Sequence, residues 1–115
     1  MDFYDRSGRA TAYLADDEHI YDWDGTPSAF IRNGNVYSYS GEHVGWLVNG
    51  WITGADGQPL LFSQEAMGGP VKPVRQVAPV RGVRSVRPVK GVAQVAPVRP
   101  VFGLGWSSNR WGSWL

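Results

Sequence analysis

The sequence predicts an all-β protein of four repeated β-hairpins, followed by an extended tail. Two periodic patterns predict this class. In the first half, a glycine preceded by Ser or Asp recurs every 16 or 17 residues, which is the spacing of successive hairpins. In the second half, valine occupies every third position from Val71 to Val101 without a break. We therefore expect a compact β unit in the first half and a tail of a different kind in the second.

The four glycines mark the expected hairpin turns, because glycine accepts the positive φ that such turns need. They are Gly8, Gly25, Gly41 and Gly57. An apolar residue lies five positions before each of them, and an aromatic residue lies five positions after. Asn-Gly pairs at 33–34 and 49–50 are expected to turn the chain between copies. Residues 3–63 should thus form an antiparallel meander of about eight short strands.

The two faces of these hairpins differ in composition if each Ser-Gly or Asp-Gly pair forms a two-residue turn. One face carries small and aliphatic residues: Phe3, Ala12, Ile20, Ala29, Val36 and Gly45. The other face is aromatic: Tyr4, Tyr13, Tyr21, Trp23, Phe30, Tyr37, Tyr39, Trp46 and Phe62. A single hairpin cannot bury either face, so the copies must stack or close into a ring.

The second and third copies, residues 20–31 and 36–47, resemble the bacterial four-fold β-flower domain. In that family four hairpins surround a pseudo-fourfold axis, so the resemblance implies this arrangement for residues 1–63. The fourth copy departs from the pattern at Thr53, Gly54 and Leu61, and the valine tail lies outside the resemblance. The family has no established biochemical activity, so the resemblance implies a fold and no reaction.

The tail, residues 71–101, is a triplet repeat of Val, then Lys, Arg or Ala, then Pro, Gly, Gln or Ser. Its prolines and its period of three exclude an α-helix. A polyproline-II-like conformation has three residues per turn and would gather the valines into one stripe and the cations into another. If straight, such a rod would be about 95 Å long. A β-extended tail and a disordered Pro-rich tail are the alternatives.

Two further segments flank the triplet rod. Residues 64–70 contain Gly68-Gly69-Pro70 and are interpreted as a hinge. Residues 102–115 are rich in Gly and Trp and are interpreted as a docking segment, with a frayed apolar end as the alternative.

Charge is divided sharply between the two halves. Residues 1–66 hold three arginines against ten acidic residues, a net charge of −7, whereas residues 67–115 hold eight basic residues and no acidic one, a net charge of +8. Each half is therefore complementary to the other half of the same or a neighbouring molecule. The chain has no cysteine, so a disulfide or thiolate metal site is excluded. No signal-peptide or transmembrane pattern is present, so localisation is unassigned, with the cytoplasm as the default and extracellular assembly open.

The sequence offers no convincing catalytic, metal or cofactor site. The segment 22–25 begins like a calcium loop, but no further ligands follow at loop spacing. The acidic cluster at 16–19 is best interpreted as a solvated linker. His43 lacks the partners of a catalytic constellation. We therefore expect a protein that is not an enzyme and needs no cofactor.

Two functions from different classes fit these patterns. The favoured one is a structural assembly protein, in which the tail joins copies of the chain into a fibre, filament or ring. The residues expected to make these contacts are Val74, Val77, Val80, Val83, Val86, Val89, Val92, Val95, Val98, Trp106, Trp111 and Trp114. The alternative is a module that binds nucleic acid or another polyanion through the basic stripe of Arg75, Arg81, Arg84, Arg87, Lys90 and Arg99. The tail lacks the interleaved aromatic residues that stack on bases, which disfavours this alternative.

Overall fold

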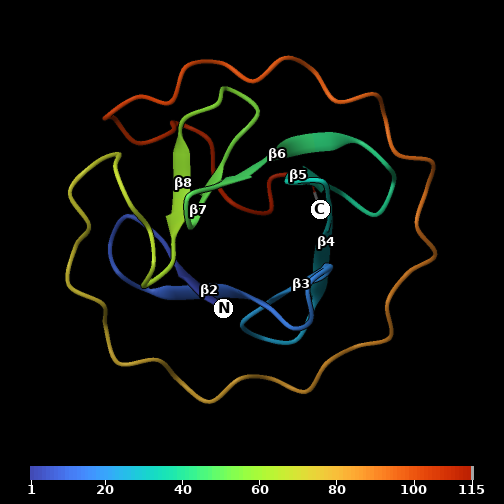
Figure 1. The fold of residues 1–115 in the computed structure, drawn as a ribbon. Coiled ribbons are helices and arrows are strands. Elements are labelled where there is room, and N and C mark those ends of the chain that lie inside the picture. Colours follow the sequence, from blue (N-terminus) through green and yellow to red (C-terminus); the bar gives the residue numbers. More distant parts are fainter. Residues whose placement is uncertain (115) are drawn as a thin grey trace.

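The computed structural model describes residues 1–114 and contains eight β-strands in a closed antiparallel barrel (Figure 1). Each strand pairs with the next, and β1 closes the barrel by pairing with β8. The strands are β1 (Asp2–Tyr4), β2 (Ala10–Leu14), β3 (His19–Asp22), β4 (Pro27–Arg32), β5 (Asn35–Tyr37), β6 (His43–Val48), β7 (Trp51–Thr53) and β8 (Pro59–Phe62). The predicted all-β fold is confirmed.

One apolar pair at the centre of each hairpin fills the barrel interior. The four pairs are Phe3↔Ala12, Ile20↔Ala29, Val36↔Gly45 and Ile52↔Leu61. Apart from Gly45, which has no side chain, these residues belong to one buried cluster, in which Phe3, Ile20, Val36 and Ile52 have no exposed surface. The barrel core is therefore made by the face that the sequence predicts to be small and aliphatic.

Aromatic pairs lie on the other face, at the seams between neighbouring hairpins. Tyr13 stacks on Tyr21 at 5.8 Å between β2 and β3, and Phe30 stacks on Tyr37 at 5.5 Å between β4 and β5. At the seam between β6 and β7, Trp46 instead pairs with Thr53, whose hydroxyl donates a hydrogen bond to the Trp46 carbonyl at 3.3 Å. The departure of the fourth copy at Thr53 thus replaces an aromatic contact with a hydrogen bond.

The hairpin turns are longer than the two residues expected, and this part of the prediction is wrong. In the second hairpin the Asp22 N–H donates to the Thr26 carbonyl and the Gly25 N–H donates to the Asp22 carbonyl, which closes a three-residue loop. The same pattern recurs in all four copies. Each loop ends in a glycine with positive φ, at Gly8, Gly25, Gly41 and Gly57.

A β-bulge in every hairpin explains why the face assignment is nevertheless right. The pairing register shifts by one residue between Phe3 and Tyr4, and at the equivalent position of each other copy. A three-residue loop moves the register by one residue, and the bulge moves it back. The inward and outward faces therefore match those expected from a two-residue turn.

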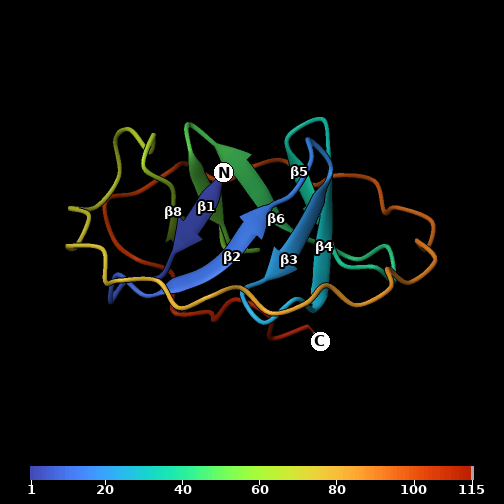
Figure 2. The same cartoon turned by 90° about the horizontal axis from the view of Figure 1, so that it is seen from below.

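After β8 the chain circles the outside of the barrel (Figure 1). Residues 71–101, called the belt below, form no strand and return close to the point where they began. The whole molecule measures only 36 × 36 × 22 Å, so a straight rod of about 95 Å is wrong. Residues 102–114, called the terminal segment, then lie against one end of the barrel (Figure 2). Within residues 1–114 there is no helix with the length and apolar character that crossing a membrane requires.

Candidate functional site

Backbone hydrogen bonds attach the belt to three successive hairpin loops. The donors recur every nine residues: the N–H groups of Gln76, Ser85 and Gln94 donate to the carbonyls of Gly8, Gly25 and Gly41 at 2.8, 3.0 and 2.9 Å. A second set has the same spacing, because Gly82 and Gly91 donate to Trp23 and Tyr39 at 2.9 and 2.7 Å. Nine residues of the belt, which are three valine triplets, therefore pass each hairpin of the barrel.

The belt and the loops approach so closely that side chains are excluded at the contact. A Cβ atom on Gly25 would lie 2.0 Å from the carbonyl oxygen of Val83, and one on Gly82 would lie 2.0 Å from the carbonyl oxygen of Asp24. Both oxygens belong to the backbone, so neither can move aside without displacing the belt or the hairpin loop. The glycines of both repeats are thus needed where the two segments cross.

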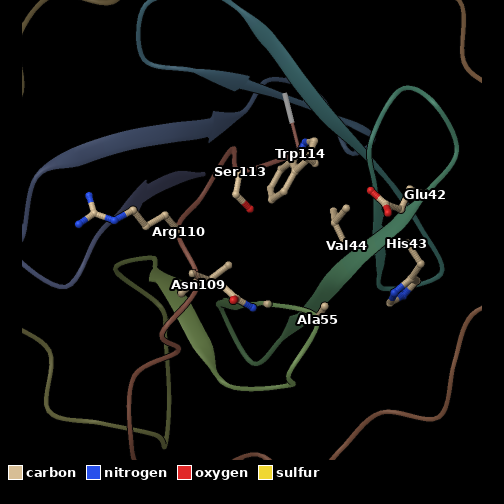
Figure 3. Close-up of a pocket in the computed structure, with 10 residues that line it drawn as sticks. Glu42, His43, Val44, Ala55, Asn109, Arg110, Ser113 and Trp114 are labelled. Atoms are coloured by element: carbon tan, nitrogen blue, oxygen red, sulfur yellow. The ribbon is translucent and has the colours of Figure 1, made fainter.

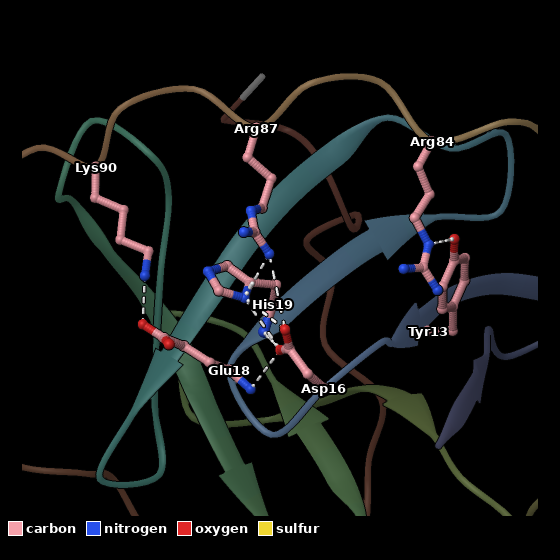
Figure 4. Close-up of polar contacts among 7 residues, drawn as sticks. All are labelled: Tyr13, Asp16, Glu18, His19, Arg84, Arg87 and Lys90. Carbon is pink, nitrogen blue, oxygen red and sulfur yellow. Dashed lines mark hydrogen bonds and ion pairs between the residues drawn. The ribbon is translucent and has the colours of Figure 1, made fainter.

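Three cations of the basic stripe, Arg84, Arg87 and Lys90, point from the belt toward the barrel (Figure 4). Arg84 donates from Nε to the Tyr13 hydroxyl at 3.1 Å. Arg87 lies 3.0 Å from Nδ1 of His19 and 3.7 Å from the carboxylate of Asp16, and Lys90 pairs with Glu18. The ammonium of Lys90 holds the pKa of Glu18 below its ordinary value. The acidic cluster at 16–19 is therefore a partner of the belt.

The outward aromatic face of the barrel also receives these cations. The guanidinium of Arg81 lies 3.9 Å from the centre of the Tyr13 ring and 4.8 Å from that of Trp23, and it pairs with Asp2. Arg75 lies 5.6 Å from the Tyr4 ring. Each cation–π contact at such exposed sites contributes about 0.5–1 kcal/mol. The opposite charges of the two halves thus meet within a single chain.

These contacts bear on the polyanion hypothesis without testing it. Five of the six cations predicted to bind phosphate already contact barrel groups, and the sixth, Arg99, has neither an ion pair nor a cation–π contact within residues 1–114. A polyanion would have to compete with the barrel for most of the stripe.

The valines of the belt point away from the barrel. All eleven, at every third position from Val71 to Val101, have exposed fractions between 89 % and 98 %. We call this set the valine rim. Because the period is three, turning the cations toward the barrel directs the valines to solvent. The valine residues predicted to make assembly contacts thus lie at regular intervals along one edge of the molecule.

Trp51 joins the two ends of the belt. Its side chain is fully buried, and its Nε1 donates to the Met67 carbonyl at 3.0 Å, just before the belt begins. Its ring lies 6.1 Å from Phe102 and 5.5 Å from Trp106, just after the belt ends. Trp51 is not among the residues predicted from the sequence. The available signal was its position, since the equivalent residues of the other copies, Asp2, His19 and Asn35, are polar.

The predicted hinge and docking segment both pack on the barrel of the same chain. In the hinge, Ala66 is buried and its carbonyl accepts a hydrogen bond from Lys72 Nζ at 2.9 Å. In the terminal segment, Trp111 Nε1 donates to Asp22 Oδ1 at 2.8 Å and Trp114 Nε1 donates to the Ser28 carbonyl at 3.0 Å. Burial raises the pKa of Asp22 although the Trp111 hydrogen bond acts to lower it. Leu115 lies outside the described residues.

A family model described as "4-fold beta flower protein" matches residues 1–115. The chain belongs to this family. The match extends over the belt and the terminal segment, beyond the residues 1–63 that carried the resemblance in the sequence. No curated protein and no solved structure matches the chain.

In the β-flower chain a cavity of about 730 Å³ beside the terminal segment is lined by residues that include Arg6, Leu61 and Trp111. A smaller pocket beside the same segment has a volume of about 240 Å³ (Figure 3). Glu42, Val44 and Trp114 surround it, whereas Arg110 points away. His43, which lines this pocket, donates a hydrogen bond from Nε2 to Asn35 Oδ1 at 3.1 Å, and burial lowers its pKa. Within residues 1–114, no three His, Asp or Glu side chains are grouped as metal ligands. The valine rim is therefore the most extensive candidate site.

Proposed function

We propose that this β-flower chain is a non-catalytic structural protein whose valine rim makes contacts between subunits. The observation that carries the proposal is the exposure of all eleven valines, none of which is below 89 %. Burying one valine fully stabilises an association by roughly 1.5 kcal/mol or more. An edge that carries eleven exposed valines at regular intervals is more apolar than a surface on which hydrophobic residues are scattered singly, and this supports an interaction surface.

The belt presents these valines at little entropic cost. The barrel of the same chain holds the belt by hydrogen bonds at nine-residue intervals. A segment that is already ordered loses less conformational entropy when it binds. The three terminal tryptophans contact their own barrel, so the proposed subunit contacts rest on the valines.

Ion pairing supports the same proposal. Arg81, Arg87 and Lys90 pair with barrel carboxylates, which reduces the like-charge repulsion that two basic tails would otherwise exert on each other. The proposed function therefore uses the two stripes of the belt differently: the basic stripe binds the barrel, and the apolar stripe binds another subunit.

Sedimentation velocity over a concentration series tests this function on the full chain. We expect wild-type protein to form larger species as concentration rises, and a variant with Val77, Val86 and Val95 changed to Thr to need at least about tenfold higher concentration. Changing the same valines to Ile keeps the apolar edge and should preserve assembly. A wild type that stays monomeric while binding heparin or DNA in a salt-sensitive manner would instead support the polyanion function.

A further inference from the structure

The valine rim follows the perimeter of a flat molecule. The three dimensions are 36, 36 and 22 Å, and the belt encircles the barrel in the view down its axis (Figure 1). Seen from the side, the belt stays within the height of the barrel strands and their loops (Figure 2). The apolar edge is thus presented sideways, around the disc.

The rim is also nearly the same in successive sectors. Belt sections 74–82, 83–91 and 92–100 each contain three valines, and the sections begin at the close approaches to Gly8, Gly25 and Gly41. Each section ends in a small or ring-constrained residue, namely Gly82, Gly91 or Pro100. A surface that fits one sector is therefore expected to fit the others.

We propose that copies of the chain associate edge to edge through the valine rim and form a flat, single-layer array. This inference rests on the proposed function and specifies its geometry. The partner is a second copy of the same chain. Growth within the plane of the disc is more specific than the fibre, filament or ring that the sequence left open.

The spacing of the valines is the reason to choose a second copy of the chain as the partner. Three residues of extended chain span at most about 10 Å, so successive valines of one rim leave regular gaps. Another rim carries valines at the same interval and can place them in these gaps. An isologous contact of this kind uses one sector of each copy, and the other sectors stay free for further copies.

The two ends of the barrel favour lateral growth over stacking. One end is covered by the terminal segment, whose Trp111 and Trp114 pack inward on the core cluster. The turns between hairpins expose polar residues, including Asp17, Asn33 and Asn49. Neither feature offers apolar surface comparable with the rim: the large exposed apolar side chain of the terminal segment is Leu104, whereas the rim carries eleven valines.

Engineered cysteines test the geometry directly, because the chain contains none of its own. Val86→Cys places a thiol on the rim, and Asp17→Cys places one in the exposed turn between β2 and β3. Under mild oxidation at an assembling concentration, we expect the rim variant to form intermolecular disulfides about tenfold faster or more, because neighbours raise the local thiol concentration. Equal rates for the two variants would overturn the edge-to-edge arrangement.

Atomic force microscopy of the unmodified assembly gives an independent readout. We expect patches of one molecular layer with a height near the 22 Å dimension. Filaments built from stacked barrels would overturn the planar inference while leaving the assembly function intact. Protein that is monomeric in sedimentation at every concentration would overturn the assembly function itself, so the two failures are distinguishable.

Discussion

Gly69 and Phe102 meet where the belt begins and ends: a Cβ atom on Gly69 would lie 2.9 Å from Cζ of Phe102 and 3.1 Å from the Trp51 ring. The contact closes the belt into a nearly complete circuit around the barrel. It also places a side chain from the far end of the chain against the segment that leads out of β8. Closure of the belt therefore depends on the absence of a side chain at Gly69.

Replacing Gly69 by Ala should loosen this closure, and Gly68 provides a matched control. Both glycines have φ of +71°, so an alanine at either position carries a similar left-handed strain of about 1–2 kcal/mol. Only Gly69 has neighbours, since nothing lies within 4 Å of a Cβ on Gly68. We expect Gly69→Ala to lose about 1 kcal/mol more in denaturant unfolding, because Phe102 must shift. Equal losses in the two variants would contradict the closing role of this contact.

Arg81 should matter more than Arg99 for holding the belt. Arg81→Gln removes a cation from the Tyr13 and Trp23 rings and an ion pair with Asp2, which together contribute about 1 kcal/mol. Arg99→Gln removes the same charge from a residue with no such contact in residues 1–114. Hydrogen exchange at the Gly82 amide, which donates to Trp23, should accelerate only in the Arg81 variant. Similar exchange in both variants would show that net charge alone retains the belt.

Trp111→Phe should destabilise the protein in a pH-dependent manner. Burial raises the pKa of Asp22, so the folded state binds this proton more tightly than the unfolded chain does, and ionisation of Asp22 reduces stability. The Trp111 N–H opposes this by stabilising the carboxylate. Its removal should therefore cost about 1–2 kcal/mol near pH 7, and less near pH 4, where Asp22 regains its proton.

Trp106→Phe is the control for this effect. Trp106 packs against Trp51 and Phe62 at 5.5 and 6.2 Å, away from Asp22. The Trp106→Phe variant should lose the same unfolding free energy near pH 7 as near pH 4. The interpretation of Asp22 would be wrong if the Trp111 variant also showed no difference between the two pH values.

The hairpin repeat made the barrel predictable because its signals occur four times. Gly8 and its three equivalents marked the loops, and the pair Phe3↔Ala12 and its equivalents marked the interior. The loop length was missed because a three-residue loop followed by a bulge gives the same alternation of faces as a two-residue turn. Alternation alone cannot separate the two arrangements.

The belt could be predicted only in part. A period of three shows that the chain has a valine stripe and a basic stripe, but it does not show which stripe faces a partner. The surface of the barrel determines which stripe faces inward, because its outward aromatic rings and carboxylates bind Arg81, Arg87 and Lys90. Trp51 was missed for a related reason: it occurs in one copy only, so no repetition marks it.

The belt is attached to the barrel once every nine residues, so its conformation depends on the barrel. The backbone hydrogen bonds of residues 71–101 run to the barrel and not to one another. The belt therefore needs a finished template, and residues 1–63 leave the ribosome first. Because residues 1–63 are synthesised before residues 71–101, the eight strands can close into the barrel before the valine rim is laid around it.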